Sequence, residues 1–194
     1  MNRWATLLAN IVLFDVLWTL AVYGAGRPWW WAAPVLILAS AGAQLRWSPA
    51  PAAESLVIFG GAVGGVLLDI AANSLGLFRY ASPSRVEFVI VFYSLWINFG
   101  TTLRPSLRWV WGRWAAAALL GGAGGLVAYW TAGRIGAIAP VEPAWRAFAW
   151  CGVQFAVAVP LWCAAASFVF TRACRSDRPG TLNASPRPPD TPAM

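Results

Sequence analysis

Hydrophobic residues form long runs along this chain, and short segments containing arginine, proline and glycine separate them. Each run is close to the ~20 residues with which an α-helix crosses ~30 Å of hydrocarbon while satisfying its own backbone hydrogen bonds. The pattern predicts an all-α, polytopic membrane protein whose transmembrane helices form three hairpins. The six predicted helices cover about residues 4–25, 28–44, 54–77, 86–103, 114–133 and 145–170.

The connections between these runs are too short to hold a soluble domain. Residues 1–171 are therefore predicted to form one helical transmembrane domain. The segment 172–194 is rich in proline, serine and threonine and has few residues to bury. That composition predicts a disordered cytoplasmic tail.

Composition and charge support a membrane setting. Only 11% of the residues are charged, whereas soluble domains carry about 25%. The net charge of +7 comes from arginines that lie singly or in small groups between apolar runs. This placement is typical of topology determinants and excludes a nucleic-acid partner. More arginines fall on the side that holds both termini, which predicts that the N- and C-termini are cytoplasmic.

Missing residue types exclude most familiar catalytic sites. The chain has neither lysine nor histidine, so it lacks a phosphate-loop lysine, a Schiff-base lysine and an imidazole base. Its three cysteines, Cys151, Cys163 and Cys174, are too widely spaced for a metal site or a disulfide framework. We therefore expect no catalytic residues, metal or cofactor, and the composition argues against an enzyme.

Carboxylates within the apolar runs are the main candidates for chemistry. An Asp at the centre of a membrane helix costs about 2.5–3.5 kcal/mol, so such residues usually face the interior and have partners. A desolvated carboxylate can act as a proton or cation relay, or it can hold helices together by hydrogen bonds. The predicted polar intramembrane pocket comprises Asp69, Asn73, Asp15, Asn10, Asn98, Thr101, Thr102 and Gln154.

Glycine pairs recur in two of the predicted helices. The segments GGAVGGVLLDIAANSLG from Gly60 and GGAGGLVAYWTAGRIG from Gly121 have similar patterns, which indicates an internal repeat of helical hairpins. Small residues four positions apart let membrane helices approach closely, within one chain or in a homodimer. The predicted helix-packing residues are Gly60, Gly61, Gly64, Gly65, Gly121 and Gly125.

A cluster of basic and aromatic residues follows the fourth predicted helix. Arg104, Arg108 and Arg113 lie close to Trp109 and Trp111. Such residues anchor a helix end at the membrane surface, and arginine can also bind a lipid phosphate bidentately. The three arginines are therefore candidates for lipid-headgroup contacts.

The segments NIVLFDVLW, GGVLLDIAANSLGL and WINFGTTLRPSLRWVWGR resemble an uncharacterised family of bacterial inner-membrane proteins, domain of unknown function 2878. The resemblance implies a small multi-pass protein of the bacterial inner membrane, with an Asp where Asp69 stands. It also implies a neutral polar residue where this chain has Asp15 and a histidine where it has Pro105, so both positions depart from the family pattern.

Together these features predict a non-enzymatic helical bundle that binds or moves a small or lipid-like molecule. Two alternatives remain open: an accessory enzyme of lipid metabolism that uses Asp69 with Thr101 and Thr102, and a scaffold for other membrane proteins. Membrane lipids are the expected partners, and a homo-oligomer or a membrane-protein partner is compatible with the glycine pairs.

Overall fold

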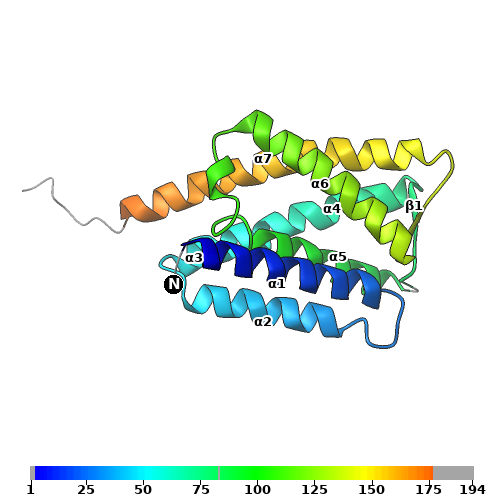
Figure 1. The fold of residues 1–194 in the computed structure, drawn as a ribbon, viewed down its shortest axis with the longest axis horizontal. Helices are drawn as coiled ribbons and strands as arrows, with labels where there is room; N and C mark the ends of the chain where they lie inside the picture. Colours follow the sequence, from blue (N-terminus) through cyan, green and yellow to red (C-terminus); the bar gives the residue numbers. More distant parts are fainter. Residues whose placement is uncertain (1–2, 83, 177–194) are drawn as a thin grey trace, which may run out of the picture.

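The computed structural model describes residues 3–82 and 84–176. The described chain is mostly helical, and its helices run roughly along the longest axis of the molecule (Figure 1). The chain begins with α1 (Arg3–Gly24) and α2 (Ala32–Arg46). A continuous helical segment follows, made of α3 (Pro51–Ser55), the π-helical turn η1 (Leu56–Gly60) and α4 (Gly61–Ser74). The chain continues with β1 (Phe78–Tyr80), α5 (Arg85–Gly100), the short 3-10 helix η2 (Arg108–Val110), α6 (Trp114–Ile135), β2 (Ile138–Pro140) and α7 (Trp145–Ser176).

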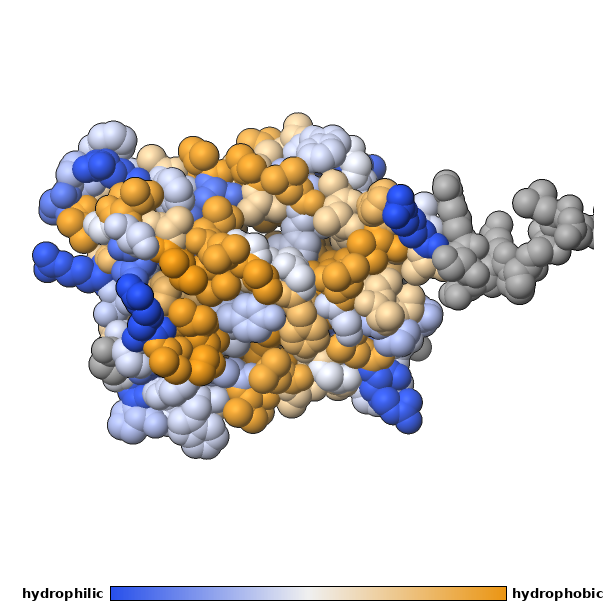
Figure 2. Space-filling model, turned by 180° about the vertical axis from the view of Figure 1, so that it is seen from behind, coloured by the Kyte–Doolittle hydropathy of each residue, from blue (hydrophilic) through white to orange (hydrophobic). Residues whose placement is uncertain are grey.

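Six long helical segments therefore lie near the predicted positions. Four of the described segments are long and apolar enough to cross a membrane: Trp4–Gly24, Pro51–Ser74, Trp114–Ile135 and Trp145–Cys174. Figure 2 shows a broad hydrophobic surface between two ends where hydrophilic residues gather. Such a surface is stable in contact with lipid but not with water, so the structure is that of a membrane protein.

Two helix ends differ from the sequence prediction by more than three residues. The second helix begins at Ala32 instead of residue 28, because the preceding tryptophans form turns that Arg27 and Trp29 help to close through their carbonyl oxygens. The last helix continues to Ser176 instead of ending near residue 170, since no glycine or proline interrupts the chain there. Residues 177–194, which contain most of the predicted tail, lie outside the described residues.

Two units of the structure share the order of elements that the predicted internal repeat requires. The units α4–β1–α5 and α6–β2–α7 each consist of a helix, a glycine with positive φ, a short strand and a second helix. Gly76 and Gly136 are these glycines, with φ of 65° and 87°. A left-handed conformation costs other residues about 1–2 kcal/mol, which explains glycine at both positions.

The two strands join the units at the end of the molecule away from the start of α1 and the end of α7 (Figure 1). They pair antiparallel, and Arg79 lies opposite Ala139 at the centre of the ladder. The flanking hydrogen bonds are symmetric: Ala81 donates to the carbonyl of Ala137, and Val141 donates to that of Leu77, both at 2.9 Å. An approximate two-fold axis therefore relates the two strands and their flanking residues.

Four of the six predicted packing glycines face other helices. A Cβ atom at Gly61 would overlap the Trp162 ring, and one at Gly65 would overlap the Trp96 ring. Gly121 and Gly125 of α6 pack in the same way against Phe155 and the neighbouring turn of α7. These contacts lie within the chain and bring the helix backbones close together. The remaining two, Gly60 and Gly64, are exposed on the outer face of the segment.

Candidate functional site

Asp69 lies at a junction of three helices. It projects from α4, is only 1% exposed, and accepts a hydrogen bond on each carboxylate oxygen. Trp96 of α5 donates its indole N–H to Oδ2 at 2.6 Å, and Tyr129 of α6 donates its hydroxyl to Oδ1. The carboxylate is thus paired with two neutral donors, which is how membrane proteins commonly accommodate a buried acid.

The local sequence explains how this junction forms. Gly65 precedes Asp69 by one helical turn, so its missing side chain leaves room for the Trp96 ring to lie against α4. The Trp96 ring also stacks on Phe155 of α7, with centroids 4.9 Å apart and planes 15° from parallel. The indole is therefore held by α4 and α7 while its N–H points at the carboxylate.

Asp69 and Tyr129 occupy equivalent positions in the two repeated units. They are 60 residues apart, the same interval that separates the two strands and the two positive-φ glycines. Their hydrogen bond therefore joins the two units at equivalent positions. The sequence signal for this partner was present, because both residues follow the aligned glycine pairs at the same distance.

Three other members of the predicted pocket lie differently. Asn73 is exposed near the end of α4 and does not share the buried surroundings of Asp69. Gln154 is buried on α7 with its amide directed toward Asp69, but neither amide atom reaches hydrogen-bond geometry with a described residue. Asp15 is exposed on α1 and lies at the edge of a large cavity that Asp69 also lines.

The remaining predicted residues form a separate network between α1 and the end of α5. Ser106 donates its hydroxyl to the side-chain oxygen of Asn10 at 2.6 Å, and Asn98 donates its amide to the carbonyl of Phe14 at 3.0 Å. The hydroxyls of Thr101 and Thr102 donate to backbone carbonyls of their own helix turn. These bonds fix α1 to α5, so the predicted polar set is divided between two places.

The predicted headgroup arginines have different surroundings. Arg104 donates to Glu54 at 3.0 Å, and Gln44 donates to the same carboxylate oxygen at 2.6 Å. Glu54 is 1% exposed. Its two partners connect α3 to α2 and to the segment that follows α5. Arg108 and Arg113 are exposed at the same end of the molecule. Sequence reasoning missed Glu54 because it begins an apolar run and its partner lies 50 residues away.

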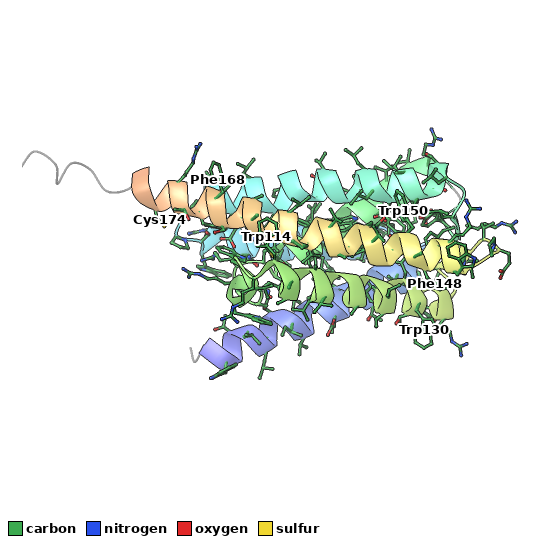
Figure 3. All side chains as sticks on the ribbon, turned by 90° about the horizontal axis from the view of Figure 1, so that it is seen from above. Trp114, Trp130, Phe148, Trp150, Phe168 and Cys174 are labelled. Carbon is green, nitrogen blue, oxygen red and sulfur yellow. The ribbon has the colours of Figure 1, made fainter. Side chains whose placement is uncertain are left out.

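A large apolar cavity lies beside the Asp69 junction. Its volume is about 620 Å³, and it lies between α1 and α6, with residues of α5 and α7 forming its floor. Figures 1 and 3 show α1 and α6 side by side, with a smaller separation at the strand end than at the other end. Phe14, Trp18, Trp96, Phe155 and Val127 are among the lining residues, and Asp15 and Asp69 are its two acidic groups.

The cavity is open between the two helices. Leu120, Gly124 and Val127 of α6 line it and are exposed, as is Asp15 on the opposite side. In a bilayer this opening faces the hydrocarbon, because both helices are among the four segments suited to cross a membrane.

Comparison with known proteins places the chain in a family. The model of a family described as a protein of unknown function, DUF2878, matches residues 7–161. The chain belongs to the DUF2878 family. This match includes most of α1, α2 to α6 and half of α7, and it therefore contains the Asp69 junction and all the lining residues of the large cavity except Cys163. No curated protein and no solved structure matches the chain.

Proposed function

We propose that this protein is a non-enzymatic membrane protein that binds a lipid-like molecule in the cavity between α1 and α6. The observation that carries the proposal is the cavity itself. Its volume of about 620 Å³ falls within the range of ~300–1,000 Å³ found for small-molecule sites. Its walls are almost entirely apolar, so a ligand with a long hydrocarbon portion fits them best.

The rigid floor of the cavity also supports a binding role. Trp96 is held by stacking on Phe155 and by its hydrogen bond to Asp69, so this wall is formed before any ligand arrives. A preformed wall reduces the ordering cost of binding. Each Asp69 oxygen has a second lone pair, which leaves acceptor capacity for a hydroxyl on the ligand.

The proposal includes a topology. The segments α2 and α5 contain 15 and 16 residues, which gives them lengths of about 23 and 24 Å at 1.5 Å per residue. We infer that they too cross the bacterial inner membrane, with local thinning of the bilayer, so that the protein has six spans and both termini in the cytoplasm. The start of α1 and the end of α7 lie at the same end of the molecule, as this topology requires (Figure 1).

The test uses the full-length protein in phosphatidylcholine nanodiscs and a diacylglycerol that carries a photoactivatable diazirine in one acyl chain. We expect labelling that saturates and is displaced by unlabelled diacylglycerol. Gly124→Phe places a ring at the cavity wall and is expected to reduce this labelling about fivefold or more. A Cβ at Gly124 meets no other atom within 4 Å, so the first carbon of the new side chain has room.

Gly64→Phe is the matched control. Gly64 is also an exposed helical glycine with no atom within 4 Å of its Cβ position, but it does not line the cavity. Labelling that is unsaturable, or that falls equally in both variants, would contradict a binding function for the cavity.

A further inference from the structure

A second cavity lies where α6 begins and α7 ends. Its volume is about 480 Å³, and its lining includes Arg113, Arg172, Ser167 and Thr171. Trp114 and Phe168 also line it, and Figure 3 shows both in the same half of the molecule, toward the end of α7. The cavity thus combines two guanidinium groups with hydroxyl and aromatic side chains.

The second cavity adjoins the large apolar one. Val110, Ala117 and Cys163 line both cavities. The two volumes therefore adjoin, and together we call them the elongated site, which is apolar along most of its length and basic at one end. This end lies where α1 and α6 are farther apart (Figure 1). A single molecule with an apolar chain and a charged head can occupy both parts.

The charge at the basic end favours an anion. None of the residues that line the second cavity is acidic, and all of them belong to the described chain. The guanidinium of Arg172 lies 4.1 Å from the centroid of the Phe168 ring, a cation–π contact that limits its orientations. Arginine binds phosphate with two parallel hydrogen bonds, which suits a site with two such side chains.

A phosphate monoester matches the two arginines better than a carboxylate does. It carries about −1.5 to −2 charges at neutral pH, whereas a fatty-acid carboxylate carries one. Thr171 donates its hydroxyl to the carbonyl of Ser167 at 2.7 Å, which leaves its own oxygen as an acceptor for a protonated phosphate oxygen. At the membrane surface these groups lie at the depth of lipid head groups.

We propose that the elongated site binds an anionic amphiphile, with a phosphate monoester head between Arg113 and Arg172 and its chain in the apolar cavity. This inference rests on the proposed function and names the class of ligand. Of the three arginines that the sequence singled out, only Arg113 lines this site.

The experiment compares two photoactivatable lipids with identical acyl chains, phosphatidic acid and diacylglycerol, on the full-length protein in nanodiscs. In the variant Arg113→Gln/Arg172→Gln we expect the affinity for phosphatidic acid to fall roughly tenfold, because charge-assisted hydrogen bonds are lost at a partly exposed site. Labelling by diacylglycerol should remain unchanged, and it also shows that the variant is folded. The control Arg108→Gln/Arg134→Gln removes the same charge from exposed positions outside both cavities.

The outcomes distinguish the phosphate-binding site from the lipid-binding function of the apolar cavity. Equal loss of phosphatidic acid binding in both arginine variants would mean that net charge alone attracts the lipid, and it would overturn the site. Displacement of phosphatidic acid by millimolar inorganic phosphate would show a free-anion site and would also overturn it. If diacylglycerol still labels the apolar cavity in either case, the proposed function stands; if neither lipid labels it, both proposals fail.

Discussion

Replacing Asp69 by leucine removes the acceptor of two buried donors at once. The Trp96 indole N–H and the Tyr129 hydroxyl both point at this carboxylate, and all three side chains are nearly inaccessible. Leucine leaves both donors without a partner in an apolar environment. Asparagine has a different effect, because its carbonyl can accept from Trp96 while its amide donates to the oxygen of Tyr129.

The structure sets the size of each effect. A buried donor left without a partner costs about 1–3 kcal/mol, which gives about 2–6 kcal/mol for the two donors. Interhelical hydrogen bonds in membranes average only about 0.6 kcal/mol, because the unfolded chain also finds partners in the bilayer. We therefore expect Asp69→Leu to lower the free energy of unfolding by about 2 kcal/mol, at the low end of that range. Asp69→Asn should lower it by about 1 kcal/mol or less.

The assay is steric-trap unfolding in lipid bicelles, which measures stability without removing the membrane. Adding Tyr129→Phe to Asp69→Leu should cause little further loss, since the hydroxyl that the phenylalanine lacks is already unpaired in the single variant. Strictly additive losses, or an asparagine variant as unstable as the leucine variant, would refute this description of the junction. A stable asparagine variant that loses only lipid labelling would instead assign Asp69 to ligand binding.

Two further predictions follow from the packing and the ion pair. Gly125→Ala should destabilise the protein by about 1–3 kcal/mol through overpacking, because the added Cβ would lie 2.5 Å from the Phe155 ring. Gly124→Ala should be neutral or stabilising in the same assay. Equal effects of the two changes would argue against close packing of α6 on α7. Arg104→Met should lower the free energy of unfolding by about 1–3 kcal/mol, because it leaves the buried Glu54 carboxylate without its cation. A second change, Glu54→Met, should restore most of that stability. No recovery in the double variant would mean that the ion pair itself stabilises the fold.

The helices could be predicted from the sequence because apolar runs and their polar boundaries are local signals. The strands β1 and β2 could not, since three residues have no distinctive pattern and the pairing joins segments far apart in the chain. The end of α7 was misplaced for a related reason. Hydropathy falls after Phe170, but nothing in the following residues stops a helix before Ser176.

The candidate site was predictable only in part. Burial of Asp69 follows from the cost of an exposed carboxylate in hydrocarbon, but the identity of its partners depends on how three helices meet. Asn73 lies one turn beyond Asp69 on the same helix, yet it is exposed, whereas Ala72 beside it is buried. The cavity could not be predicted at all, because it arises from the angle between α1 and α6.

Mapping the residues that the diacylglycerol probe labels tests the central claim most directly. After irradiation in nanodiscs, peptide mass spectrometry locates the labelled side chains. Binding in the cavity predicts saturable labels concentrated on the lining residues of α1 and α6, around Phe14–Val22 and Ala117–Ala132, with few on the exposed face of α2. Labels spread evenly over all lipid-facing helices, α2 included, would contradict the account, because they would show that the protein meets lipid only as a solvent.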